Sequence, residues 1–133
     1  MLGCIESSTQ VEEYLMKLKA VLCSDQFDVY SDLEVQFSLI EGEPGFLNAQ
    51  TLVDLGYSII DVRNALLSLT VQDYSETMFD NRDITGPGFR VFGKSIDKKE
   101  IYIKVKIRKR ANNEIFCISF HYSQYPIAYP FRV

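Results

Sequence analysis

The sequence lacks the features that mark membrane, secreted and zinc-stabilised proteins. No stretch approaches the length of about 18 apolar residues that a membrane helix needs, and the start of the chain lacks the basic residues and apolar run of a secretory signal. The three cysteines, Cys4, Cys23 and Cys117, have no CxxC spacing, which argues against a disulfide framework and against a zinc site. We therefore expect a cytoplasmic protein with reduced cysteines and no metal or cofactor.

Length and composition favour one domain over residues 1–133. The chain has 47% hydrophobic and 24% charged residues, which is ordinary for a globular protein. A chain of this size can bury a hydrophobic core without help from cross-links.

Charge is divided unevenly along the chain. Residues 1–80 hold three basic and 14 acidic residues, a net charge of -11, whereas residues 81–133 hold 11 basic and four acidic residues, a net charge of +7. The overall charge of -4 conceals this division. Because the second part attracts phosphate, the pattern predicts that it binds a polyanion.

Capping motifs and apolar spacing predict a mainly helical first half. Residues 26–40 fit an edge strand, a strand pair or an irregular arm, and the sequence leaves these three open. The expected helices cover about residues 10–23, capped by Thr9 with Glu12; 48–55, capped by Asn48 and ended by Gly56; 58–69, capped by Ser58 with Asp61; and a short turn or helix from Thr70 and Asp73 to about Met78.

From Phe89 onward the apolar period changes to two, which indicates strands over 89–94, 100–108 and 114–122. In EIYIKVKIR the odd positions are apolar and the even positions polar, so one side should pack on the helices and the other should meet solvent. This predicts an α+β fold with N-terminal helices packed on one face of a C-terminal antiparallel β-sheet. The tail SQYPIAYPFRV has prolines that stop sheet extension and aromatic residues expected to pack back on the body.

Strand register decides which polar residues share a face. A KRANN turn with 108 opposite 115 places Lys104 opposite Ser119 and Tyr102 opposite His121. A SIDKK turn with 94 opposite 100 places Arg90 opposite Lys104. These two registers gather seven residues on a single exposed face: Arg90, Lys94, Tyr102, Lys104, Lys106, Ser119 and His121.

The predicted face contains the groups that RNA cleavage needs when a 2′-hydroxyl attacks its own phosphate. His121, the only histidine, can act as base or acid. Tyr102 can donate a proton or hydrogen bond, and Arg90 and Lys104 can stabilise the developing negative charge. The remaining polar side chains are assigned to RNA binding: Lys94, Lys106, Ser119 and Arg108.

Structural and non-catalytic interpretations of the same residues stay open. A lone histidine near a strand end is more often a hydrogen-bonded structural residue than a catalyst, and a basic strand face is often only solvated. A non-catalytic RNA- or protein-binding module would have the same fold. A third interpretation is that the acidic half covers the basic face or engages a basic partner.

Several motifs resemble the motility quorum-sensing regulator (MqsR) toxin family of bacterial type II toxin–antitoxin systems, which have a RelE-like fold. The resemblance covers roughly residues 9–122 and is carried by LNAQTLVDLGYSIIDVRNALLSLTVQDYSETM, FRVFGK, EIYIKV and CISFH. It implies a metal-independent mRNA interferase that is neutralised by a cognate antitoxin, and it leaves the involvement of the ribosome open. The family's catalytic positions fall on Tyr102, Arg90 and His121.

One position departs from the family pattern. Where better-known members carry a lysine in D-F-Y-K-S-M, this chain has D-Y-S-E-T-M, which places Glu76 there. A cation that binds phosphate is thus replaced by a carboxylate. Glu76 is a surface acid, a partner of a cation in the site, or a base, and the sequence does not separate these roles.

Overall fold

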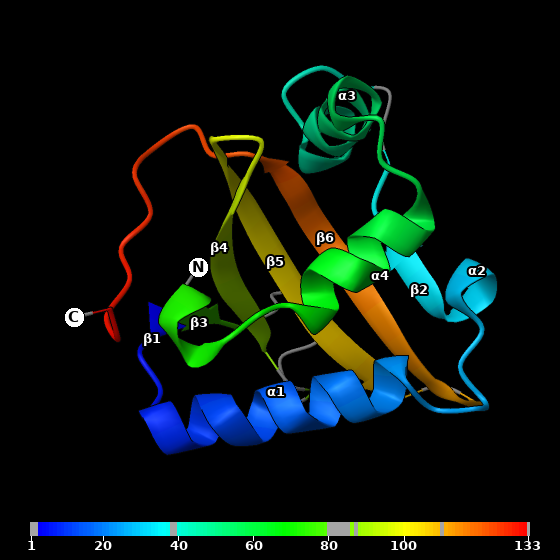
Figure 1. The fold of residues 1–133 in the computed structure, drawn as a ribbon, viewed down its shortest axis with the longest axis vertical. Helices are drawn as coiled ribbons and strands as arrows, with labels where there is room; N and C mark the ends of the chain where they lie inside the picture. The colour runs from blue at the N-terminus through cyan, green and yellow to red at the C-terminus, as the bar shows by residue number, and fades with distance from the viewer. Residues whose placement is uncertain (1–2, 38–39, 80–85, 87, 110, 133) are drawn as a thin grey trace.

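The computed structural model describes residues 3–37, 40–79, 86, 88–109 and 111–132. They form a six-stranded sheet with the order β1-β3-β4-β5-β6-β2, and helices α1 and α4 cover one face of it (Figure 1). The predicted α+β class, with N-terminal helices on a sheet built largely from C-terminal strands, is confirmed. The elements are β1 (Gly3–Cys4), α1 (Ser8–Leu22), α2 (Val29–Asp32), β2 (Leu33–Val35), α3 (Pro44–Leu55), α4 (Ile59–Leu67), the 3₁₀ helix η1 (Val71–Asp73), β3 (Tyr74–Met78), β4 (Phe89–Ile96), β5 (Lys99–Lys109) and β6 (Asn113–Tyr122).

Helix α1 has more buried residues than any other helix of the described structure. Its residues Val11, Leu15 and Leu18 are buried together with Ile101, Ile103 and Val105 of β5, as the alternation of β5 predicts. The expected capping box of Thr9 and Glu12 is wrong, because Ser7 is the N-cap and Gln10 completes the box. Within the described residues, no helix combines the length and apolar character needed to cross a membrane.

Helix α3 begins earlier than the sequence predicted. Pro44 occupies its first turn, where the missing N–H costs nothing, and Glu43 is the N-cap. The prediction that Asn48 caps this helix is therefore wrong, and Asn48 is a fully buried residue of its second turn. The predicted end is confirmed, because Gly56 adopts the left-handed conformation with φ 67°.

The following segment confirms two predicted capping boxes and corrects an element boundary. Ser58 and Asp61 cap α4 as predicted, and Thr70 with Asp73 caps η1. Residues 74–78 then form strand β3 instead of extending a helix to Met78, because Tyr74 and Thr77 turn into the interior. The ambiguous segment 26–40 contains α2 and the edge strand β2, which pairs in parallel with β6. Most of the expected loop DNRDITGPG lies outside the described residues.

The β4–β5 hairpin differs by one residue from the predicted register. Its turn consists of Asp97 and Lys98, both with positive φ (52° and 67°), and Ile96 pairs with Lys99. Two positive φ values are typical of a two-residue type I′ turn, which matches the twist of the strands. The predicted pairing of 94 with 100 is therefore wrong.

Strand β6 contains a bulge that reverses its alternation. Lys104 pairs with Ser119 as predicted, but Val105 pairs with Cys117, so Ile118 is an extra residue. Before the bulge, Ile115 and Cys117 face the core, whereas after it Phe120 does. The expected pairing of 108 with 115 is consequently wrong, while the pairings Lys104–Ser119 and Tyr102–His121 are confirmed.

Candidate active site

A pocket of about 490 Å³ lies between the sheet and the C-terminal tail, residues 123–132. The sheet contributes most of the polar side chains, which project from the face opposite the hydrophobic core. The tail, which carries no regular secondary structure, contributes the other side. Ser75 of β3 lies at the sheet side of the pocket, together with the five residues that we call the pocket floor: Glu76, Tyr102, Lys104, Ser119 and His121.

Cross-strand pairing places the floor residues in two adjacent rows. One row runs from Gly93 to Tyr102 and His121, whose rings are stacked with centroids 5.5 Å apart and planes 18° apart. The other row runs from Glu76 through Val91 to Lys104 and then Ser119. Directly opposed side chains are about 5 Å apart, so these groups can contact one small ligand together.

His121 is held as a neutral imidazole with a defined tautomer. The residue is 9% exposed, and burial lowers its pKa below 6.5, while a hydrogen bond to the Tyr122 carbonyl partly opposes that effect. Because a carbonyl only accepts, Nδ1 donates this 2.9 Å bond. The other ring nitrogen, Nε2, then keeps a lone pair and can accept a proton.

Tyr102 is held as a protonated phenol. Burial raises its pKa above 10, and the negative charge of Glu76 raises it further. At neutral pH the hydroxyl can therefore donate a hydrogen bond or a proton. The floor thus combines a base and a donor with the carboxylate of Glu76 and with Lys104, whose Nζ lies 5.2 Å from the Phe89 ring centroid.

The prediction of a single exposed basic face is wrong. Ser119 and His121 are 4% and 9% exposed, so the tail side and neighbouring residues cover much of this face. Lys106 is 4% exposed and lies with its Nζ 5.2 Å from the Phe89 ring centroid. Arg108 stacks over Phe116 with its Cζ 4.3 Å from that ring centroid. Neither Lys106 nor Arg108 lines the pocket.

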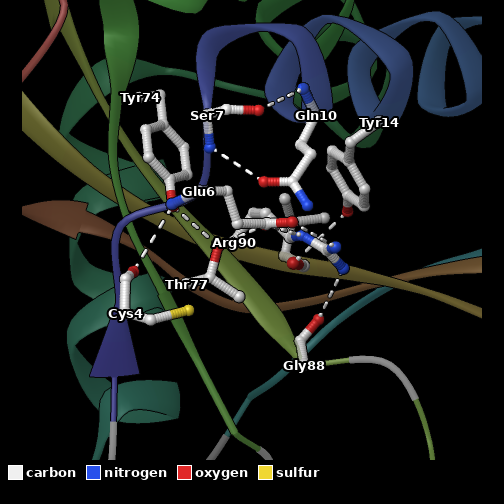
Figure 2. A network of polar contacts seen from close by, with 10 residues as sticks. Cys4, Glu6, Ser7, Gln10, Tyr14, Tyr74, Thr77, Gly88 and Arg90 are labelled. Atoms are coloured by element: carbon white, nitrogen blue, oxygen red, sulfur yellow. Dashed lines mark hydrogen bonds and ion pairs between the residues drawn. The ribbon is translucent and has the colours of Figure 1, made fainter.

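Arg90 and Lys94 lie on the opposite face of the sheet, which corrects their predicted placement. The one-residue register change pairs Arg90 with Val105 and Lys94 with Ile101, both of which face the core. Arg90 donates from Nε to Glu6 at 2.9 Å and lies 4.4 Å above the Tyr14 ring (Figure 2).

Lys94 is likewise held on the core side of the sheet. Its ammonium donates to the Ser68 carbonyl at 3.2 Å and lies 3.4 Å from Asp73. Arg90 and Lys94 therefore form ion pairs with Glu6 and Asp73, and neither cation lines the pocket.

Carboxylates of the first half neutralise cations of the second half throughout the described structure. This pairing supports the interpretation that the acidic half restrains the basic half, and it removes much of the broad positive field expected from the sequence. The pairs are Arg90–Glu6 at 2.9 Å, Lys94–Asp73 at 3.4 Å, Lys99–Asp54 at 3.7 Å, Arg108–Glu34 at 2.7 Å and Arg132–Asp73 at 3.4 Å.

The tail is anchored to the body beyond the pocket, as its aromatic residues predict. Gly93 leaves room for Tyr129, whose hydroxyl donates to Glu100 at 2.6 Å. Phe131 stacks on Tyr74 with ring centroids 5.8 Å apart. No local pattern in the sequence indicates that this tail also forms one side of a pocket, because that depends on its path across the sheet.

Two further observations bear on the site. Among the described ranges, no group of three or more His, Cys, Asp and Glu residues is placed to hold a metal ion.

Comparison with known proteins finds no family model, curated protein or solved structure that matches this chain.

Proposed function

We propose that the chain is a metal-independent endoribonuclease that acts in the pocket floor. The observation that carries the proposal is the stacked pair of Tyr102 and His121, which brings a phenol and a neutral imidazole together inside a pocket that Lys104 also lines. Proton removal, proton donation and charge stabilisation are the three tasks of RNA transesterification.

The proposed reaction begins when His121 Nε2 removes the proton of a ribose 2′-hydroxyl. The 2′-oxygen attacks the adjacent phosphorus while the bond from phosphorus to the 5′-oxygen breaks. Lys104 stabilises the negative charge on the phosphate oxygens, and Tyr102 donates a proton to the departing 5′-oxygen. The products are a 2′,3′-cyclic phosphate and a 5′-hydroxyl.

Glu76 has a supporting part in this proposal. Its charge raises the pKa of Tyr102, after the larger effect of burial, and so favours the protonated donor. The carboxylate also lies in the same cross-strand row as Lys104, one strand removed. Glu76 therefore favours the acid form of Tyr102 without itself binding phosphate.

The biological setting of the proposal is that of the toxin in a toxin–antitoxin pair. It comes from the resemblance of the sequence motifs to the MqsR family, with mRNA as substrate, an antitoxin protein as partner and the cytoplasm as compartment. Expression of the chain should arrest growth, and co-expression of a small neighbouring gene should restore it. Normal growth under strong expression of the folded protein would contradict this setting.

The chemistry is tested by incubating purified protein with end-labelled RNA in the presence of a chelator. We expect fragments that end in a 2′,3′-cyclic phosphate, with a rate at least roughly 100-fold lower in His121→Ala. Tyr102→Phe should also lower the rate. Tyr30→Phe is the matched control, because Tyr30 is 73% exposed on α2 and does not line the pocket. Cleavage that continues unchanged in both active-site variants would sink the assignment.

A second candidate function is RNA binding without turnover, and the burial of the floor favours it. Ser119 and His121 are only 4% and 9% exposed, which restricts access of a polymer to both groups. This candidate predicts RNA affinity that falls with salt, because phosphate contacts dominate such binding. Measurable affinity with no cleaved product on sensitive gels would select it over the nuclease.

A further inference from the structure

The two sides of the pocket differ sharply in chemistry. The floor carries imidazole, phenol, ammonium, hydroxyl and carboxylate groups. The tail lines the facing side first with the polar residues Ser123 and Gln124 and then with aromatic and apolar residues, which we call the tail wall: Tyr125, Pro126, Ile127 and Ala128. A ligand that fits both sides has a polar or anionic part and a planar apolar part.

Hydrogen bonds hold the tail wall in place although it lacks regular secondary structure. The Ser123 hydroxyl donates to the Tyr125 carbonyl, and the Ile127 N–H donates to Glu100 at 3.4 Å. Tyr129 binds the other oxygen of Glu100 at 2.6 Å, so the same carboxylate fixes two points of the tail. A wall that is already ordered loses little conformational entropy when a ligand binds.

Tyr125 is an aromatic residue that lies outside the hydrophobic core. The residue is 79% exposed, yet it lines this pocket and also an adjoining pocket of about 520 Å³ that includes Lys99. A large exposed aromatic side chain at the rim of a polar pocket offers a flat surface on which a ring can stack.

We propose that the tail wall is a subsite for a nucleobase next to the cleaved phosphodiester, with Tyr125 stacked on that base. The inference rests on the proposed function. It adds the nucleobase, whose stacking would position the phosphodiester over the pocket floor. Nucleobases have the planar, partly apolar shape that this wall accepts, and stacking on aromatic residues tolerates every base. The pocket volume of about 490 Å³ is in the usual range for small-ligand sites.

The test compares binding of adenosine 3′-monophosphate, uridine 3′-monophosphate and inorganic phosphate by equilibrium dialysis. We expect both nucleotides to bind more tightly than phosphate, and Tyr125→Ala to weaken them by roughly tenfold while phosphate binding stays unchanged. Tyr125→Phe, which keeps the ring, should restore nucleotide binding. Tyr30→Ala is the matched control, because Tyr30 is also highly exposed, at 73%, and does not line the pocket.

Failure of the subsite and failure of the nuclease give different results. Nucleotide affinity equal to that of phosphate, or unchanged in Tyr125→Ala, overturns the subsite even if RNA is cleaved in a His121-dependent manner. Tyr125-dependent nucleotide binding without any RNA cleavage supports the subsite and overturns the nuclease. Absence of both activities in the folded wild-type protein overturns both proposals.

Discussion

The buried amide of Asn48 in α3 accepts a 2.7 Å hydrogen bond from the backbone N–H of Phe120 in β6. The same side chain donates to the carbonyls of Ile118 at 2.9 Å and Gln36 at 2.8 Å. These bonds surround the bulge that turns Phe120 into the core and places His121 on the pocket face. Without the extra residue, the alternation of β6 would direct His121 inward.

Asn48→Ala should destabilise the fold by about 3 kcal/mol, because it leaves buried backbone groups without partners. Urea denaturation measures this loss. The matched control is Asn64→Ala, since Asn64 is exposed on α4 and its change should stay within about 0.5 kcal/mol. Equal effects of the two substitutions would show that the Asn48 bonds do not support the bulge.

The pH dependence of cleavage should reflect the shifted pKa values of His121 and Tyr102. Burial lowers the pKa of His121 below 6.5, so the neutral base is lost only as pH falls below that value. Burial and Glu76 raise the pKa of Tyr102 above 10, so the acid is lost only above pH 10. The kcat/KM profile should be flat between these limits. NMR titration of the single histidine gives an independent check, and a midpoint above 6.5 would contradict the assignment.

The ion pair of Glu6 and Arg90 should stabilise the protein at neutral pH and less so in acid. Burial alone would raise the pKa of Glu6, but hydrogen bonds from Arg90 and Thr77 and the charge of Arg90 outweigh it, so its pKa lies below 4.5. The folded state therefore binds this proton more weakly than the unfolded state, and the stabilisation is lost as pH falls below 4.5.

Denaturation of Glu6→Gln at several pH values measures this effect. The variant should be less stable than the wild type by about 1–2 kcal/mol at pH 7, with the difference shrinking below pH 4.5. Glu13→Gln, on the exposed side of α1, is the matched control. A Glu6→Gln difference that stays constant down to pH 3 would disprove the linkage.

Gly93→Ala should displace the tail, because an added Cβ would lie 2.0 Å from the Tyr129 hydroxyl. We expect a destabilisation of about 1–3 kcal/mol by overpacking. In the Tyr129→Ala background the same substitution should cost much less, since the colliding ring is absent. Thermal or urea unfolding of the four proteins in this cycle measures the coupling, and strictly additive effects would contradict the contact.

Local patterns predicted the elements whose apolar spacing is regular. They failed where contacts between distant residues determine the strand register. The alternation of Ile101, Ile103 and Val105 identified the core face of β5 correctly. The register of β4 was missed because Asp97 and Lys98 form the positive-φ turn without the glycine that usually signals it. That single-residue error placed Arg90 and Lys94 on the wrong face.

The candidate site was partly predictable for the same reason. Tyr102 pairs with His121 and Lys104 with Ser119 as the hairpin sum predicted, but only because the extra residue Ile118 offsets the one-residue error made at the turn. The bulge is fixed by Asn48, which lies 70 residues earlier than Ile118 and gives no local signal in β6.

The acidic residues of the ion pairs between the two halves are translated before most of their basic partners. Glu6 and Asp73 leave the ribosome before Arg90, Lys94 and Arg132 exist, so the early chain is a strongly anionic segment whose counter-charges are still untranslated. Strands β4, β5 and β6 are also translated after all the helices that pack on the sheet. Native assembly must therefore wait until these three strands are translated, when charge neutralisation and sheet closure become available together.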